Sequence, residues 1–436
     1  MKKLVLLLSI LFALFLVSCT NLSLTRIKVL LPGNMYAGKP FIVKVGVMGP
    51  FNFLLSNVDV EINGQTYRTD SSGYAHVQFL FLKAGSYKIG VKYEEITQEI
   101  VLNVKPASWL VIGWIGADNN LSSYVDQDIQ EMKKAAKDVA VILLVDHLKS
   151  EKSDGIYALS NEGEFLQIET LNELNSGCRD TFSWFIKKYQ NCDAVRKSLI
   201  IWNHGTAWND VDPYKTKGIS YDDTDKDFLT IDELKGVLEG THWDVLGFDA
   251  CLMASVEVLY ELKNSADFFL AAPGEIPSTG WDYSFLGEIS NSDSKSFCQK
   301  AVQFWRAHYN NSKFRYSLNA WEKEKFTEAV KQFADRLKSI PPEVQPEVLP
   351  ICAIYSLNPR LCDFGEVLAS FEWSDVLKEF QRACLSEITT QLHLNVFFPQ
   401  SKDQLDNYRE MYSKLSFASQ TGWLNWLDKY FSTILP

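Results

Sequence analysis

The chain has 436 residues, 46% of them hydrophobic, and a formal net charge of −11 at pH 7. This composition excludes a globally disordered chain, and the length favours two domains. The acidic chain shows no clustered basic stripe, which disfavours binding to phosphate backbones, so we expect no nucleic-acid partner.

The first 19 residues have the pattern of a targeting segment. Lys2 and Lys3 precede an apolar run, Leu4–Val17, that is too short to span a bilayer. The end of this run, Leu16-Val17-Ser18-Cys19, resembles a bacterial lipobox, which implies removal of residues 1–18 and acylation of Cys19. The alternative is an ordinary secretory signal that contains a cysteine. We therefore expect a membrane-anchored lipoprotein outside the cytoplasm, at the cell surface or in the periplasm, with residues 19–25 as its lipidated tether.

Residues 26–105 have the pattern of an all-β domain. Short apolar or alternating runs are separated by turn dipeptides such as Asn63-Gly64 and Ala84-Gly85. About seven such strands predict a β-sandwich. The segments 67–75 and 84–89 resemble bacterial immunoglobulin-like modules, and the resemblance implies a spacer or docking role.

From residue 106 to residue 436 strands alternate with helical patterns, which predicts an α/β domain with a mostly parallel sheet. A capping box at Thr230–Glu233 predicts the start of one helix, and the periodicity of Leu252–Lys263 predicts another. The apolar runs that predict buried strands are Trp109–Ile115, Val139–Val145, Ser198–Asn203, Val245–Ala250 and Phe268–Ala272.

Neither the cysteines nor the acidic residues have the spacing of a metal site. No two of the eight cysteines form Cys-x-x-Cys, and there is no His-Glu-x-x-His. Asp222–Asp227 fails the EF-hand template, so we expect a solvated acidic loop, no metal ligands and no cofactor. Cys178 with Cys192, or Cys352 with Cys362, are possible disulfides, and buried free thiols are the alternative.

Two predicted strands end in residues that can act together as a nucleophile and its base. The strand Ser198–Asn203 is followed by His204, and the strand Val245–Ala250 is followed by Cys251. Parallel neighbours would bring the imidazole to the thiol, which attacks a carbonyl only as the thiolate. We expect three aids to Cys251: the N-terminus of a following helix, the carboxyl edge of the sheet, and His204 as base. The amides of Gly205 and Cys251 are the candidate oxyanion donors.

These residues also carry a family resemblance. Asn203-His204-Gly205 and Asp249-Ala-Cys-Leu-Met-Ala-Ser255 resemble the catalytic blocks of the clostripain family of cysteine peptidases. Four further segments resemble that family in the same order: Gly116–Leu121, Gly218–Asp223, Glu275–Tyr283 and Leu394–Pro399. The resemblance implies a caspase-like α/β/α sandwich, a Cys251–His204 dyad and endopeptidase action on polypeptides.

The resemblance also implies cleavage after Arg or Lys through acidic residues in the specificity pocket. Asp282, next to Trp281, is our candidate carboxylate, and a helix cap is the alternative. Asp249 is a candidate for the pocket floor, with a purely structural role as the alternative. Relatives are often zymogens cut after a basic residue, and Lys149, Lys152, Lys215 and Lys217 lie in predicted loops. Calcium dependence, known for some relatives, has no readable motif here.

Two other functions remain open at this point. The chain could be a catalytically silent surface binding or adhesion lipoprotein built on a peptidase-like fold. It could also be a cell-surface amidase or transpeptidase, which would use the same thiol chemistry.

Overall fold

The computed structural model describes residues 25–148, 153–208, 218–310, 318–340, 361–386 and 391–434. The chain divides into two compact units, residues 1–106 with 160–162 and residues 107–159 with 163–436. Among the described residues, we find no helix with both the length and the apolar character that crossing a membrane requires. Several predictions lie outside the described residues: the signal segment, Cys19, the four loop lysines and Cys352.

The first unit consists of two sheets that are almost entirely antiparallel. One has the strand order β1-β3-β6 and the other β2-β8-β7-β4-β5, where only the β2–β8 pair is parallel. Alternate residues of β3 and β7, such as Val43, Val45, Ile89 and Val91, are buried, as expected for strands that cover one shared core. The strands are β1 (Arg26–Leu30), β2 (Met35–Tyr36), β3 (Phe41–Met48), β4 (Asp59–Ile62), β5 (Gln65–Arg68), β6 (Tyr74–Phe79), β7 (Gly85–Tyr93) and β8 (Ile96–Lys105).

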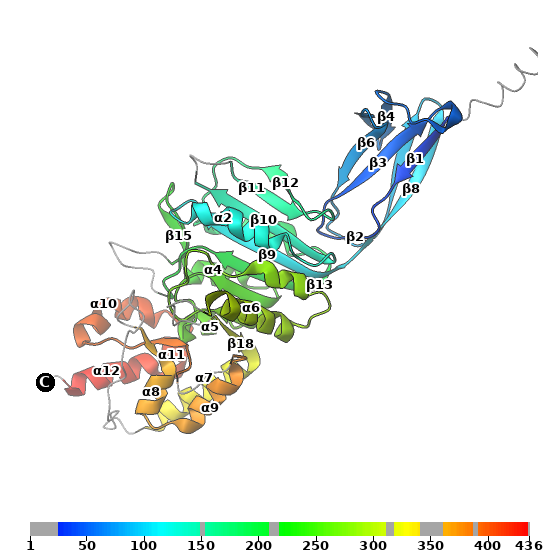
Figure 1. Cartoon of the computed structure of the whole chain (residues 1–436). Helices are drawn as coiled ribbons and strands as arrows, with labels where there is room; N and C mark the ends of the chain where they lie inside the picture. Colours follow the sequence, from blue (N-terminus) through cyan, green and yellow to red (C-terminus); the bar gives the residue numbers. More distant parts are fainter. Residues whose placement is uncertain are drawn as a thin grey trace, which may run out of the picture. The chain divides into compact units, whose positions relative to one another are not determined.

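An eight-stranded sheet forms the centre of the second unit, in the order β12-β11-β10-β9-β13-β16-β17-β18 (Figure 1). The five strands β10, β9, β13, β16 and β17 are parallel, and antiparallel strands flank them. This sheet confirms the mostly parallel α/β architecture expected from the sequence. The strands are β9 (Ala107–Ala117), β10 (Val139–His147), β11 (Gly155–Leu159), β12 (Phe165–Thr170), β13 (Ala194–Trp202), β16 (Trp243–Asp249), β17 (Ala266–Ala271) and β18 (Asn319–Glu322).

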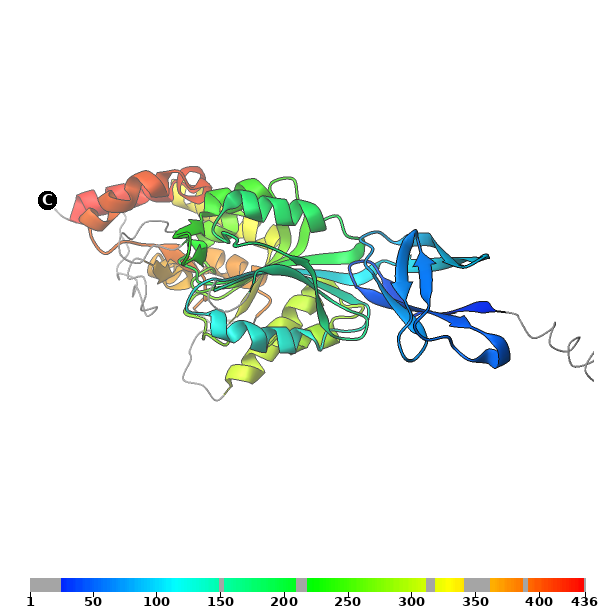
Figure 2. The same cartoon turned by 90° about the horizontal axis from the view of Figure 1, so that it is seen from above.

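Helices cover both faces of this sheet (Figure 2). Trp109 and Trp114 of β9 are an odd number of residues apart and therefore point to opposite faces. Trp109 packs on Phe297 of α6, whereas Trp114 packs on Phe182 of α3. The helices flanking or following the sheet are α2 (Val125–Met132), α3 (Arg179–Tyr189), α4 (Ile231–Leu238), α5 (Val256–Glu261), α6 (Ser294–Tyr309), α7 (Lys323–Lys338), α8 (Phe364–Ser370), α9 (Ser374–Ala383), α10 (Lys402–Ser413), α11 (Ser416–Thr421) and α12 (Trp423–Ile434).

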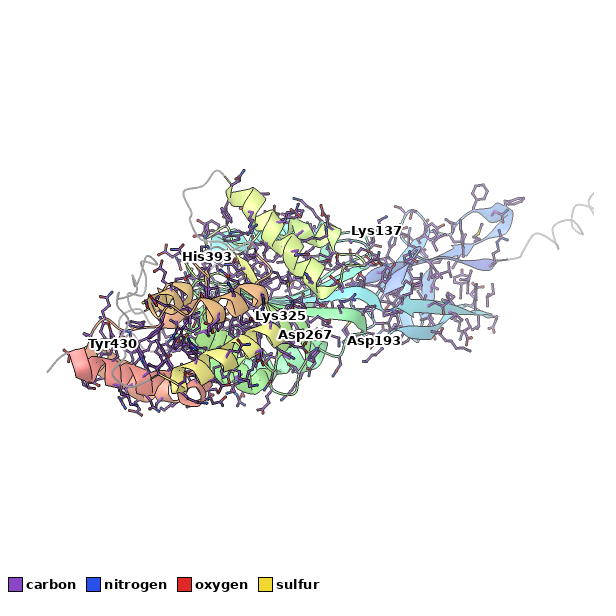
Figure 3. All side chains as sticks on the ribbon, turned by 90° about the horizontal axis from the view of Figure 1, so that it is seen from below. Lys137, Asp193, Asp267, Lys325, His393 and Tyr430 are labelled. Carbon is purple, nitrogen blue, oxygen red and sulfur yellow. The ribbon has the colours of Figure 1, made fainter. Side chains whose placement is uncertain are left out.

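The C-terminal segment packs against the turn that follows β16. In β20 (Asn395–Phe397), which pairs with β19 (Leu361–Asp363), the Asn395 amide donates to the carbonyl of Ala254. The Asn395 side chain donates to the carbonyl of Pro273. Tyr430, which Figure 3 labels on α12, stacks on Trp426 of the same helix at 4.9 Å between ring centroids.

Two local predictions require correction, while the capping box at Thr230 is confirmed. The helix expected from Leu252 begins only at Val256. The expected acidic loop is a hairpin of β14 (Ile219–Asp222) and β15 (Asp227–Leu229), in which Asp222 is fully buried. Of the disulfides that the sequence left open, the pair Cys178–Cys192 does not form, whereas Cys362 is disulfide-bonded.

Candidate active site

The pairing of β13 with β16 places His204 and Cys251 together. The two strands are parallel, and Trp202 pairs with Asp249 at their carboxyl ends. His204 and Cys251 each follow this pair by two residues, so both leave the sheet at the same edge. Both line one cavity of about 240 Å³. The cavity is also lined by Asn120, Leu121, Trp202, Asn203, Asp249, Glu275, Ile276, Pro277, Ser278 and Gly280.

The turn after β9 orients the histidine. The Nε2 atom of His204 lies 2.7 Å from Oδ1 of Asn120, an oxygen that only accepts hydrogen bonds. Nε2 therefore carries the hydrogen in the neutral ring, and Nδ1 keeps the lone pair that can accept a proton. The side chain of Asn119 secures this turn by donating to the carbonyls of Gly116 and Tyr221. Asn120 lies within the segment Gly116–Leu121, which resembles the clostripain family, but the sequence alone assigned it no role.

The thiol of Cys251 is partly buried at the cavity wall. Its Sγ accepts a hydrogen bond from the Ile276 amide at 3.3 Å. Burial raises the pKa of the Cys251 thiol to about 11, and the charges of Glu275 and Asp249 act in the same direction. The resting thiol is therefore protonated at neutral pH.

The expected help from a helix N-terminus at Cys251 is absent. The described helix α5 begins at Val256, five residues after the cysteine, and its dipole acts only over its first turn. Leu252 instead adopts a left-handed conformation with φ of 66°. This conformation is uncommon for a residue with a large side chain, and it makes a sharp turn directly after Cys251.

Gly205 permits close contact between the segments that carry His204 and Cys251. A Cβ atom at this position would lie 2.5 Å from the carbonyl oxygen of Cys251, which no real side chain tolerates. Gly205 forms a bridge with Ile219, and the hydrogen bond there comes from the Thr206 amide to the Gly218 carbonyl. The Gly205 amide is not part of that hydrogen bond.

Of the acidic candidates for substrate recognition, Asp249 lies at the cavity and Asp282 does not. Oδ2 of Asp249 accepts hydrogen bonds from the Trp281 amide at 2.9 Å and the Tyr283 hydroxyl at 2.8 Å. Its Oδ1 is buried and has no protein partner in the described residues. Asp282 accepts a hydrogen bond from the Ser284 amide, which matches the capping alternative. Trp281 is buried against Gly247 and is not among the residues that line the cavity.

The Asp249 carboxyl lies in an acidic, poorly solvated environment. Burial raises its pKa to about 7, and the charge of Glu131 contributes in the same direction. The neighbouring Asp128 accepts a hydrogen bond from Nε1 of Trp202 at 2.7 Å. Burial and the charge of Asp249 raise the pKa of Asp128 to about 9. Sequence reasoning missed Asp128 because it lies on α2, more than 100 residues before Asp249.

Comparison with known proteins identifies the family. A model of the clostripain family matches residues 113–359, more than half of the chain. The chain belongs to the clostripain family. Its members include clostripain of Hathewaya histolytica, to which the chain is 28% identical over 246 residues. That match covers 46% of this chain and 47% of clostripain, so the chain spans about half the length of the curated relative.

Solved structures show that the fold is shared. One is an inactive zymogen of a C11 protease from Parabacteroides distasonis, with a TM-score of 0.61 and 20% identity over 72% of this chain and 98% of that one. Another is a secreted C11 cysteine protease from Bacteroides thetaiotaomicron in complex with an irreversible peptide inhibitor. Its TM-score is 0.60, with 19% identity over 73% of this chain and 99% of that one. The predicted family and its α/β fold are thus confirmed.

Proposed function

We propose that the protein is a cysteine endopeptidase that uses a Cys251–His204 dyad. The observation that carries the proposal is the register of β13 and β16, which places both residues two positions beyond the Trp202–Asp249 pair and at one cavity. The reaction needs no organic cofactor, because the thiol supplies the nucleophile and the imidazole supplies the base.

The proposed reaction begins with proton transfer during attack. Because the thiol is neutral at rest, Nδ1 of His204 accepts the Sγ proton as sulfur bonds to the substrate carbonyl carbon. The amides of Gly205 and Cys251 donate to the oxyanion. The C–N bond then breaks, His204 protonates the leaving amine, and a thioester remains. Water, deprotonated by His204, hydrolyses this thioester and releases the second product.

We further propose a preference for Arg or Lys before the scissile bond. The cavity is lined by the carboxyls of Asp249 and Glu275. One oxygen of Asp249 is buried without a protein partner, which suits a cationic side chain that donates to it. This assignment replaces Asp282, whose carboxylate caps the turn at Ser284.

The test is labelling and cleavage with matched variants. We expect an irreversible peptidyl inhibitor with a terminal Arg to label the wild type, and Cys251→Ala and His204→Ala to lose cleavage of Arg and Lys peptides. Cys178→Ala is the matched control, since Cys178 is also a free, partly exposed thiol but does not line the cavity. Equal, negligible activity of wild type and Cys251→Ala would instead support the silent binding lipoprotein. Transfer of the acyl group to an added amine in preference to water would identify a transpeptidase.

The proposed location is a bacterial membrane outside the cytoplasm, through a lipid on Cys19. Mass spectrometry of the mature N-terminus is expected to find residue 19 first and acylated. Cys19→Ser is expected to release the protein from the membrane fraction. An unmodified N-terminus would contradict the anchor and leave the peptidase proposal intact.

A further inference from the structure

Two exposed phenylalanines lie close together on one loop of the first unit. Phe51 is 73% exposed and Phe53 is 71% exposed, the highest values among the large hydrophobic side chains that the structure describes. Single exposed hydrophobic residues are common on protein surfaces, but two aromatic rings on one short loop form a local apolar tip. We call the segment from residue 49 to residue 55 the aromatic loop.

The base of the aromatic loop is closed by backbone hydrogen bonds. The Gly49 amide donates to the carbonyl of Phe53 at 2.9 Å, and the Leu55 amide donates to the carbonyl of Val47 at 2.8 Å. Val47 lies in β3, so these bonds join both ends of the loop to the end of that strand. The two phenylalanines therefore extend from a defined base.

Leu54 fills the inner side of the aromatic loop and leaves the rings outside. Its side chain packs on Gly46 and Gly73, where an added Cβ atom would lie only 2.7 and 2.5 Å from it. Phe51 adopts a left-handed conformation with φ of 64°, which is uncommon for an aromatic residue. Both rings thus stay exposed although the backbone conformation is unfavourable, a combination that is typical of functional segments.

The aromatic loop lies at the end of the first unit where the chain enters it. The first residue of β1, Arg26, pairs with Met48, the last residue of β3. Nη2 of Arg26 also donates to Oδ1 of Asn52 at 2.9 Å, so the entering chain contacts the loop itself. Arg26 follows Cys19 by seven residues, which span at most about 25 Å. A lipid on Cys19 would therefore keep the aromatic loop close to the membrane surface.

The chemistry of the aromatic loop suits the boundary between lipid headgroups and acyl chains. The sequence from Val45 to Val58 contains no Asp, Glu, Lys or Arg, so insertion of the tip removes no charged side chain of this segment from water. Phenylalanine and leucine are among the residues with which interfacial proteins enter the outer part of a bilayer. A charged protein surface, in contrast, would find no counter-charge within this segment.

We propose that the aromatic loop inserts Phe51 and Phe53 into the lipid bilayer, as a second membrane contact beside the lipid on Cys19. This inference rests on the proposed membrane location, because the anchor brings the loop to the bilayer. Insertion is then an intramolecular step, so the burial of two side chains is sufficient to favour it. Burial of one phenylalanine shifts such an equilibrium by about 10- to 150-fold. The second contact fixes the orientation of the first unit on the membrane.

The test supplies the anchor artificially, so it depends neither on acylation of Cys19 nor on peptidase activity. The chain is prepared as residues 20–436 with Cys251→Ala, which prevents self-cleavage and keeps every other residue that the structure describes. An N-terminal hexahistidine tag tethers it to phosphatidylcholine vesicles that contain a nickel-chelating lipid. A phosphatidylcholine with a photoreactive diazirine on its acyl chain labels the inserted residues. We expect mass spectrometry to find the label on residues 49–55.

The decisive variant combines Phe51→Ser with Phe53→Ser. It is expected to lower labelling of the aromatic loop at least tenfold. Its melting temperature should stay within about 2 °C of that of the parent, because both side chains are exposed. Leu31→Ser is the matched control: Leu31 is an exposed apolar residue of the same unit outside the loop, and this variant should be labelled as the parent is.

Two results would overturn the proposal directly: an unlabelled aromatic loop in the parent, or equal labelling in the double variant. A third is self-association of the parent in solution without vesicles that the double variant abolishes, because the loop would then bind a second copy of the chain. Absence of a lipid on Cys19, in contrast, would appear only in the mass spectrum of the mature N-terminus.

Discussion

Replacing Asp249 with Asn separates the contribution of this residue to stability from its contribution to substrate binding. Burial raises the pKa of Asp249 from 3.8 to about 7, so ionising it costs the folded state free energy. Because the folded pKa is the higher one, stability is lost as the pH rises from about 4 through 7. The full shift of about 3 units corresponds to about 4 kcal/mol, and about 2.5 kcal/mol of this develops between pH 5 and pH 8.

Asn cannot ionise, so Asp249→Asn should lack this pH-dependent penalty. The amide oxygen can still accept from Trp281 and Tyr283, and any cost of the unpartnered amide group does not depend on pH. Urea unfolding of both proteins in a Cys251→Ala background, at pH 5 and pH 8, measures the difference. We expect the variant to gain about 2.5 kcal/mol relative to the parent across this interval. Parallel pH profiles for the two proteins would refute the assignment of a buried, raised-pKa carboxyl at this site.

The same substitution should impair recognition of cationic substrates. Losing one partner of a buried charge pair costs about 2–4 kcal/mol, or a 30- to 1000-fold loss of kcat/KM on Arg and Lys peptides. Peptides with a neutral residue before the scissile bond should change far less. Asp282→Asn tests the other acidic candidate. Asn also caps turns well, so we expect the KM of Asp282→Asn for Arg peptides to stay within about twofold of the wild-type value. A large loss in Asp282→Asn but not in Asp249→Asn would reverse the assignment.

Four further predictions follow from single contacts. Asn120→Ala should lower kcat about 10-fold with little change in KM, because the His204 ring loses the acceptor that orients it. The pH profile of kcat should also change, and an unchanged profile would contradict this role of Asn120. Gly205→Ala should reduce kcat at least 100-fold and lower the free energy of unfolding by about 1–3 kcal/mol, because a Cβ would clash with the Cys251 carbonyl. Activity assays and urea unfolding measure these two effects. Thr230→Ala should lower stability by about 0.5–2 kcal/mol without affecting kcat, because it removes a capping box remote from the cavity. Alkylation of Cys251 by iodoacetamide should accelerate about tenfold per pH unit between pH 7 and 10, and a plateau near neutrality would contradict a thiol pKa of about 11.

The central sheet and the proximity of His204 to Cys251 were predictable because their signals are local. Continuous apolar runs mark the buried strands, and His204 and Cys251 stand directly after two of them. Parallel pairing of these two strands is then sufficient to place both residues at the same edge of the sheet. The helix after Cys251 begins later than the apolar periodicity predicts, because Leu252 adopts a left-handed conformation. No residue type in this turn favours that conformation, so the sequence does not predict it.

The remaining parts of the site depend on contacts between distant segments. Asp118 follows β9, whereas Asp146 lies in β10 and Asp222 in β14, so no template of contiguous residues could detect that their carboxylates lie close together. Asp249 and Asp282 are the same residue type, so the sequence does not distinguish them. Only the hydrogen bonds of each carboxylate distinguish their roles. Asn120 lies 84 residues before His204, and residue type alone does not reveal their contact.

The contacts of Asn395 have a consequence for the timing of folding around Cys251 during synthesis. Asn395 donates hydrogen bonds to the carbonyls of both Ala254 and Pro273, which follow Cys251 in the chain, yet it is translated 395 minus 251, or 144, residues after Cys251. At about 5–20 residues per second, the ribosome needs roughly 7–30 s to reach it. A nascent chain therefore carries Cys251 for many seconds before Asn395 can form these contacts. The turn that follows β16 acquires its hydrogen bonds with Asn395 only when nearly the whole polypeptide has been synthesised.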